Sequence, residues 1–267
     1  MAYELAIVGG GNMGTALLGG LIARGAADPS DVVIVEPSEA RRAVLANEFP
    51  DIDVAVEPVS CRSAVIAVKP QYVADVVAEV VAEGARRLLS IAAGVATDTI
   101  AAAADAANPA SEAVSVLRAM PNTPALVGEG VTALCAAVGT PDSDVVWAEQ
   151  ILAGVGLVLR VDESQLDAVT GLTGSGPAYV FLIAEALVDA GVLAGLPRQL
   201  AEPMVSQLLV GSAKLLADRG DAAGLRAMVT SPGGTTAAGL RVLEEHAVRS
   251  AVIEAVQAAA ERSRQLG

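Results

Sequence analysis

The sequence predicts an α/β fold, with an N-terminal Rossmann-type, doubly wound parallel sheet followed by an all-helical domain. Three observations support this prediction. A short apolar run ends in a glycine-rich turn at 9–14 and continues as an apolar helical pattern. Strand-like and helical patterns then alternate up to about Val161, and beyond Asp162 the hydrophobic period stays helical. We therefore expect a dinucleotide-binding domain over residues 1–162 and a helical domain over 163–267.

The first strand is the apolar run Leu5–Val8, and the glycine turn follows it directly. Gly9 permits the tight turn, Gly11 removes a side chain where the backbone must approach a pyrophosphate, and Gly14 lets the helix pack close to the strand. The start of this helix offers unpaired N–H groups to phosphates. The intervening residues of the turn are Gly10, Asn12 and Met13. A strand before the turn and a helix after it favour dinucleotide binding.

The second strand, Val32–Val35, ends at Glu36, and Ser38 marks the start of the next helix. Glu36 occupies the position of the acidic residue that bonds the adenosine ribose, which favours NAD. Ser38 and the nearby pair Arg41 and Arg42 could instead accept a 2′-phosphate, which favours NADP. These residues alone leave the choice of dinucleotide open.

The later strand-like runs complete the predicted sheet. They are Val54–Val56, Ala64–Val68, Leu88–Ile91, Val114–Leu117, Val131–Ala136 and Leu157–Val161, with helical patterns at Val73–Val81 and Thr97–Ala104. Three strand ends would open onto the same carboxyl edge as the glycine turn, where ligands bind in such sheets. They are Ala67-Val68-Lys69-Pro70, Ala92-Ala93-Gly94 and Met120–Pro124.

The helical half contains a very apolar run, Pro177–Ala190, which predicts a surface that meets another subunit. Two segments look unlike ordinary connectors: Thr173–Pro177 and Thr230–Thr236. Each offers hydroxyls and open backbone N–H groups at a helix start, which is what a carboxylate needs in the absence of a basic side chain. The second segment combines three hydroxyls and is the stronger candidate for a substrate site.

Charge and composition narrow the possible partners. The formal charge of −14 would repel nucleic acid and anionic lipid. The spacing of Cys61 and Cys135 predicts neither a metal site nor a disulfide framework, so we expect buried thiols in a reducing compartment. We see no leader segment, and expect charge or glycine to break every apolar stretch before it reaches membrane-spanning length. The sequence thus predicts a cytoplasmic protein without a metal or a membrane partner.

Four motifs in register make the sequence similar to the pyrroline-5-carboxylate reductase family over essentially the whole chain. They are Val68-Lys69-Pro70, Arg118–Pro124, Thr173–Tyr179 and Ser231-Pro232-Gly233-Gly234-Thr235-Thr236. The resemblance implies that hydride passes from a nicotinamide dinucleotide to the ring C=N of a cyclic imino acid. It implies NADPH as the usual donor, with NADH also accepted, and a homodimer that can assemble into a decamer. Glu36 departs from the polar neutral residues commoner at its position in the family.

The resemblance also implies roles for individual residues. The phosphate turn falls on Gly9–Gly14, a further cofactor contact on Ala67–Pro70, and the nicotinamide end on Ala92, Ala93, Asn122 and Glu163. Ser231 and the amides of Gly234 and Thr235 would hold the substrate carboxylate, and Thr236 would bond the ring nitrogen.

Three other functions compete with this one. A 2-hydroxyacid or β-hydroxyacid dehydrogenase would need a base, but Lys214, the only lysine of the helical half, lies far in sequence from Gly174-Ser175-Gly176. An imine reductase for a six-membered ring would differ only in pocket size. A non-catalytic dinucleotide sensor would not need the hydroxyls of the loop at 230–236. The only histidine, His246, is expected to lie at the surface or cap a helix.

Overall fold

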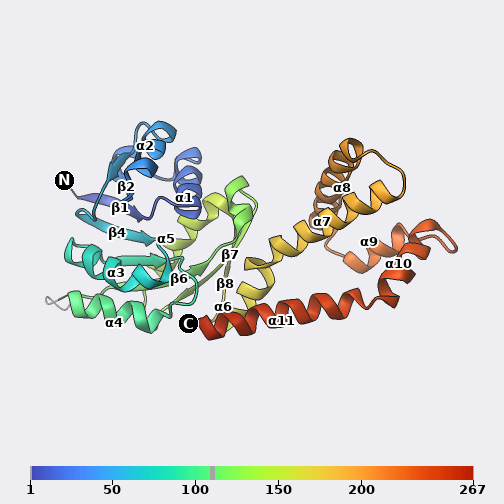
Figure 1. Cartoon of the computed structure of the whole chain (residues 1–267). Coiled ribbons are helices and arrows are strands. Elements are labelled where there is room, and N and C mark those ends of the chain that lie inside the picture. The colour runs from blue at the N-terminus through green and yellow to red at the C-terminus, as the bar shows by residue number, and fades with distance from the viewer. Residues whose placement is uncertain (1, 109–111, 267) are drawn as a thin grey trace. The chain divides into compact units, whose positions relative to one another are not determined.

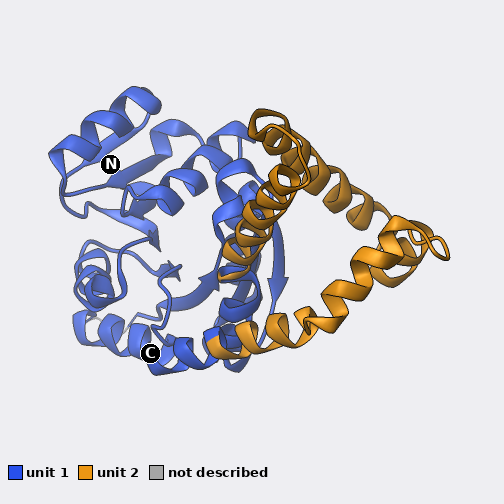
Figure 2. Cartoon of the chain, turned by 45° about the vertical axis from the view of Figure 1, so that its right-hand side comes forward, with its two compact units in different colours: residues 1–174, 259–267 blue, residues 175–258 orange. Residues whose placement is uncertain are grey.

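The chain divides into two compact units in the computed structural model, which describes residues 2–108 and 112–266. Unit 1 contains residues 1–174 and 259–267, and unit 2 contains residues 175–258 (Figure 2). Met1 and Gly267, the outer ends of the two predicted domains, lie outside the described residues. The division predicted at residue 162 stays a prediction, since unit 1 extends to Gly174 and also includes the C-terminal end of the chain.

Unit 1 is built around one sheet, whose eight strands among the described residues have the order β3-β2-β1-β4-β5-β6-β7-β8 (Figure 1). Their bounds are β1 Tyr3–Val8, β2 Val32–Val35, β3 Asp53–Ala55, β4 Cys61–Ile66, β5 Arg87–Ser90, β6 Ser115–Met120, β7 Gly130–Ala136 and β8 Gly156–Arg160. Each strand lies on or within a few residues of a predicted run. The reversal of strand order beside β1 is typical of a doubly wound sheet and confirms the predicted fold class.

One strand pair departs from the parallel pattern. β6 and β7 pair antiparallel, with Leu117 opposite Ala136, whereas β7 and β8 pair parallel. The connection from β6 to β7 contains only the short 3₁₀ helix Thr123–Val127, too little chain for the crossover that a parallel pair requires. The chain therefore turns back at the carboxyl edge, next to the predicted nicotinamide end.

Helices cover both faces of the sheet (Figure 1). Two clusters of apolar side chains fill the space between these helices and the sheet. The helices are α1 Asn12–Ala23, α2 Glu39–Glu48, α3 Val73–Ala82, α4 Thr97–Ala107 and α5 Asp142–Leu152. Leu17 and Leu18 of α1, together with Leu152 of α5, pack on one face. Val77 of α3 and Ile100 of α4 pack on the other. Because both faces are buried, the strands read as continuous apolar runs.

Unit 2 consists of helices, as predicted. They are α7 Gly176–Leu193, α8 Arg198–Arg219, α9 Ala222–Met228, α10 Thr235–Glu245 and the first part of α11 Val248–Leu266. The end of α11 belongs to unit 1, where the Ser263 hydroxyl donates a 2.6 Å hydrogen bond to Asp167 of the short helix α6, Leu166–Val169.

The segment before α7 corrects two expectations. Residues Thr170–Gly174 form a π-helical turn, and the Thr173 hydroxyl donates to the Val169 carbonyl at 3.1 Å. Thr173–Pro177 therefore belongs to the helical segment that leads into α7 and is not a loop with a free Thr173 hydroxyl.

The second correction concerns the length of this helical segment. Helical structure runs from Glu163 to Leu193, 31 residues with a mean hydropathy of 1.5 over its most apolar window. By length and composition this stretch could cross a membrane, so the expectation that every apolar stretch is broken earlier is wrong here.

Candidate active site

The glycine turn joins β1 to α1 with two positions that exclude any side chain. Gly9 has φ +113°, and a Cβ there would lie 2.4 Å from the Ala67 carbonyl oxygen. A Cβ on Gly14 would lie 2.1 Å from the Gly9 carbonyl oxygen, so α1 packs directly against the turn. A Cβ on Gly11 would meet nothing within 4 Å, and Gly11 caps α1 without a side-chain hydrogen bond. The start of α1 therefore presents backbone N–H groups next to open space, which suits a diphosphate.

The Glu36 carboxylate lies at the end of β2 and bonds to the glycine turn. Its two oxygens accept hydrogen bonds from the backbone N–H groups of Gly10 at 3.0 Å and Ser38 at 2.9 Å. These bonds hold the carboxylate in the place where an adenosine ribose is bound in Rossmann folds.

Arg41 faces the same turn from α2. Its Nε donates to the Gly10 carbonyl at 2.5 Å, and its Nη2 donates to the Thr15 hydroxyl at 2.8 Å. Arg42 instead donates to the carbonyls of Glu36 and Pro37. Of the two arginines considered as 2′-phosphate ligands, Arg41 is thus the one anchored beside the phosphate turn. The Ser38 side chain caps α2 by accepting from the Arg41 N–H at 3.4 Å.

A cleft of about 270 Å³ opens at the carboxyl edge of the sheet. It brings together residues that the sequence placed at three strand ends, and its lining is Met13, Ala67, Val68, Lys69, Pro70, Ile91, Ala92, Ala93, Met120 and Pro121. The structure therefore confirms that the three strand ends lie together at one edge of the sheet.

The side chains of Asn122 and Glu163, both predicted near the nicotinamide, form hydrogen bonds with other segments of unit 1. The Asn122 amide donates to the Thr173 carbonyl at 3.0 Å and accepts from the Val131 N–H at 2.8 Å. Glu163 accepts from the Thr97 N–H at 2.8 Å and from the Thr97 hydroxyl at 2.6 Å. In this structure both residues hold the loops that border the cleft.

Arg118 joins Thr97 and Glu163 to form a cluster of three polar side chains. From the sequence, Arg118 was identified only as part of a motif and was given no role of its own. Its Nη1 lies 3.0 Å from a Glu163 oxygen, and its side chain is 11% exposed. Burial raises the pKa of Glu163, but the bonds from Thr97 and Arg118 outweigh that effect and leave this pKa below its ordinary value. Glu163 is therefore ionised at neutral pH and ties the N-terminus of α4 to the segment that follows β8.

In unit 2, the loop at 230–236 carries three hydroxyls at the start of α10. Gly233 has φ +70°, and the Gly234 N–H donates to the Ser231 carbonyl at 3.0 Å, which makes a tight turn. Gly234 caps α10 without a side-chain hydrogen bond. Within the described part of the chain, the hydroxyls of Ser231, Thr235 and Thr236 have no hydrogen-bond partner.

The remaining residues singled out in the sequence have structural positions. His246 is exposed and caps the C-terminus of α10. Lys214 is exposed on α8. Cys61 and Cys135 are buried and free, and burial raises the pKa of each thiol to about 11. The sequence predicted that both thiols are buried, and the structure confirms this.

Comparison with known proteins gives the same picture along the whole chain. Residues 163–266 match the family model for pyrroline-5-carboxylate reductase dimerisation, and residues 4–94 match that for NADP oxidoreductase, coenzyme F420-dependent. The chain is 44% identical to the pyrroline-5-carboxylate reductase of Synechocystis, over 100% of this chain and 99% of that protein.

Two solved structures are similar over nearly their full lengths. That of a pyrroline-5-carboxylate reductase from Coxiella burnetii has 33% identity and a TM-score of 0.89, covering 100% of this chain and 99% of that one. That of Plasmodium falciparum pyrroline carboxylate reductase with NADP bound has 30% identity and a TM-score of 0.84, covering 99% and 98%.

Proposed function

The chain belongs to the pyrroline-5-carboxylate reductase family, and we propose that it reduces the ring C=N bond of 1-pyrroline-5-carboxylate to give L-proline, the last step of proline biosynthesis. NADPH is the hydride donor, with NADH accepted less well. The observation that carries this proposal is the match to named reductases over the full length of both chains. A match to the fold alone would not identify the reaction.

The dinucleotide is held by unit 1. Gly9, Gly11 and Gly14 shape the turn, and the N–H groups of Asn12 and Met13 at the start of α1 bind the diphosphate. The open space beside Gly11 supports this fit, because nothing lies within 4 Å of a Cβ built there. NADPH supplies the hydride from the C4 atom of its nicotinamide ring.

At the nicotinamide end, Ala67–Pro70, Ala92 and Ala93 form the walls of the cleft. These residues are small or apolar apart from Lys69, so they shape the cleft and exclude water. Asn122 and Glu163 act through the loops that they hold. Glu36, Ser38 and Arg41 surround the adenosine ribose and decide between NADH and NADPH.

The substrate is held by the loop at the start of α10. Ser231 and the amides of Gly234 and Thr235 bind its carboxylate, and Thr236 bonds the ring nitrogen. The three free hydroxyls and the uncapped N-terminus of α10 support these roles. A cyclic imine that is protonated is already electrophilic, so the residues need to hold and orient it and need not act as a strong acid or base.

The competing functions have weaker support. A hydroxyacid dehydrogenase requires a base at the alcohol. Lys214 lies on α8, whereas such a lysine would be expected on α7, the helix that follows Gly174-Ser175-Gly176. A sensor without turnover does not account for three unpartnered hydroxyls in one loop. A six-membered imine remains an alternative substrate for the kinetic test.

Assembly as a homo-oligomer follows from the dimerisation domain that residues 163–266 match. We propose a homodimer formed through unit 2, assembled further into a decamer. A groove of about 730 Å³ between α7 and α8 supports the dimer, and the side chains of α7 around it are unusually exposed for apolar residues. They include Val180 and Phe181, which line the groove, and α7 also exposes Leu182 and Ile183. A cytoplasmic location is proposed from the two unpaired, buried thiols.

The proposal is tested by mixing the purified protein with pyrroline-5-carboxylate and NADPH and following absorbance at 340 nm. A steady decrease that depends on both reactants, together with L-proline in the product, is expected. Turnover of the six-membered imine at an equal or higher kcat/KM would replace the proposed substrate.

A further inference from the structure

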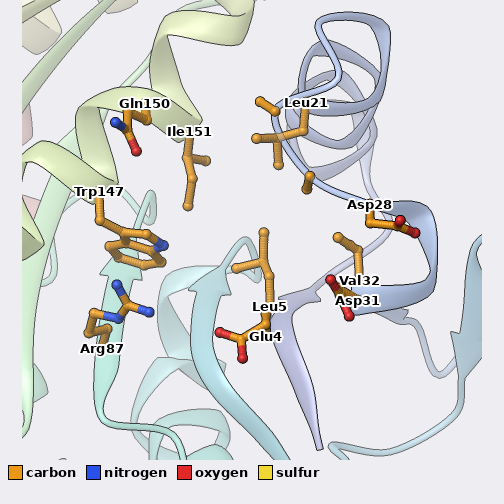
Figure 3. Close-up of a pocket in the computed structure, with 12 residues that line it drawn as sticks. Glu4, Leu5, Leu21, Asp28, Asp31, Val32, Arg87, Trp147, Gln150 and Ile151 are labelled. Carbon is orange, nitrogen blue, oxygen red and sulfur yellow. The ribbon is translucent and has the colours of Figure 1, made fainter.

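A second cavity lies at the opposite edge of the sheet, where the parallel strands begin (Figure 3). Its volume is about 330 Å³, at the small end of the range for ligand sites. Leu5 lies near the start of β1, Val32 at the start of β2 and Arg87 at the start of β5. The dinucleotide and substrate residues proposed above are absent from its lining, so the proposed reaction does not use it.

Three residues that line this cavity, Leu5, Val32 and Arg87, belong to one row of side chains across the sheet. Val32 pairs with Leu5, Leu5 pairs with Ser63, and Ser63 pairs with Arg87. All four therefore point to the same face, which α1 and α5 cover. Ser63 is fully buried, and its hydroxyl is the one buried side-chain oxygen without a hydrogen-bond partner in the described residues. A buried polar atom without a partner calls for an explanation in a native structure, and this one lies between two residues that line the cavity.

One wall of the cavity carries a guanidinium. The Arg87 Cζ atom lies 5.0 Å from the centre of the Trp147 ring, so a cation–π contact orients the side chain. Arg87 makes no ion pair with any carboxylate among the described residues, although the chain has 31 acidic residues. In a protein this acidic, a half-buried arginine without a carboxylate partner is available to an anionic group from outside.

The opposite wall carries carboxylates. Figure 3 shows Asp28 and Asp31 across the cavity from Arg87 and Trp147, with Leu5 and a third carboxylate, Glu4, between the two walls. The Glu4 carboxylate is paired with Arg62 at 3.4 Å. Bonds from the Ser30 hydroxyl and N–H lower the pKa of Asp28, so its carboxylate is ionised at neutral pH. Asp31 makes no side-chain hydrogen bond or ion pair within the described part of the chain.

We propose that this cavity binds a small zwitterion, whose carboxylate pairs with Arg87, whose ammonium group pairs with Asp31 and Asp28, and whose short alkyl body lies on Leu5. The site is independent of the proposed reaction and defines a place where a metabolite of the amino-acid type can bind away from the cofactor edge.

The width of the sheet sets the length of the ligand. Arg87 and Val32, the neighbour of Asp31, belong to strands three positions apart, which is roughly 14 Å at about 4.8 Å per strand. The Arg87 and Asp31 side chains cover part of this width and leave several ångströms to be bridged. An ω-amino acid with a chain of about five carbons fits this gap better than an α-amino acid, whose charges are closer together.

Trp147 is the only tryptophan of the chain, so its fluorescence reports on this cavity directly. The probe is 5-aminopentanoate, titrated into the whole protein, with pentylamine and pentanoate as analogues that lack one charge each. We expect a saturable fluorescence change with 5-aminopentanoate and a Kd about tenfold higher for either analogue, as one charge-assisted hydrogen bond implies.

Arg87→Met should raise the Kd of 5-aminopentanoate about tenfold, and Asp31→Asn should raise it without altering the fold, because Asp31 is exposed. Arg219→Met, which removes an exposed arginine at the end of α8, is the matched control and should leave the Kd unchanged. All three variants should keep the wild-type rate of NADPH oxidation. Equal Kd values for the three compounds, or a Kd insensitive to both Arg87→Met and Asp31→Asn, would overturn the proposal.

Discussion

Glu163 and Thr97 are joined by two hydrogen bonds, because the carboxylate accepts from both the backbone N–H and the hydroxyl of Thr97. The two residues are 66 positions apart in the sequence, and their pairing ties the start of α4 to the segment that leads into unit 2. Arg118, which lies on β6, stabilises the ionised carboxylate of Glu163. This cluster borders the cleft in which we place the nicotinamide.

Glu163→Gln should therefore destabilise unit 1 by about 1 kcal/mol at pH 7, since it weakens charge-assisted bonds. The pKa of Glu163 is lower in the folded than in the unfolded protein, where it is about 4.3. Its contribution is thus present above pH 4.3 and is lost as the pH falls through the folded-state value. Urea unfolding should show a larger difference at pH 7 than at acidic pH, and an equal loss at both would argue against the ionised cluster. Glu129→Gln, at an exposed site, is the control.

The fold of unit 1 was predictable from local patterns, and this cluster was not. The glycine turn, the apolar strands and the helical periods each lie within a few residues, so the sequence shows them directly. The Arg118–Glu163 contact joins residues 45 positions apart, and no local pattern marks it. The sequence predicts a loop at Thr173–Pro177 because glycine and threonine favour loops. Its first two residues instead end the π-helical turn Thr170–Gly174, in which the threonine hydroxyls bond back to the preceding turn. Family resemblance, and not spacing, supplied the roles of Ser231 and Thr236.

Thr236→Ala should lower kcat/KM by about tenfold to a hundredfold, because one hydrogen bond to the reacting ring is lost. The matched control is Thr230→Ala in the same loop, whose hydroxyl already donates to the Arg226 carbonyl at 2.6 Å. Steady-state kinetics with NADPH measure kcat/KM for both variants, and Thr230→Ala should keep the wild-type value. Wild-type kinetics in Thr236→Ala would remove this residue from the mechanism.

Glu36→Ser should improve the use of NADPH and weaken the use of NADH, and we expect the ratio of the two kcat/KM values to change by about tenfold. A carboxylate at the place of Glu36 can accept bonds from a ribose diol but would repel a 2′-phosphate, whereas Arg41, anchored beside the same turn, would favour the phosphate. The wild-type enzyme should accept both donors with a modest preference for NADPH. Kinetics with each donor test this, with Glu39→Ser in the exposed first turn of α2 as the control. An unchanged ratio would mean that Glu36 does not face the ribose.

Phe181→Asp should raise the dissociation constant of the homodimer at least about tenfold. Phe181 is 62% exposed in the single chain, and the substitution would place a charge inside the proposed interface. Light scattering at micromolar concentration measures the change in mass. Val138→Asp, at a fully exposed position of unit 1, should leave the mass unchanged. A wild-type chain that is monomeric and active at this concentration would contradict assembly through unit 2.

The most direct test of the proposed reaction follows the transferred hydrogen. The protein is incubated with pyrroline-5-carboxylate and NADPH that carries deuterium at the transferred C4 position, and the product is analysed by mass spectrometry. We predict L-proline one mass unit heavier, with the deuterium on the former imine carbon and one NADPH consumed for each proline formed. Unlabelled proline, or NADPH consumption without proline, would contradict direct hydride transfer to the C=N bond.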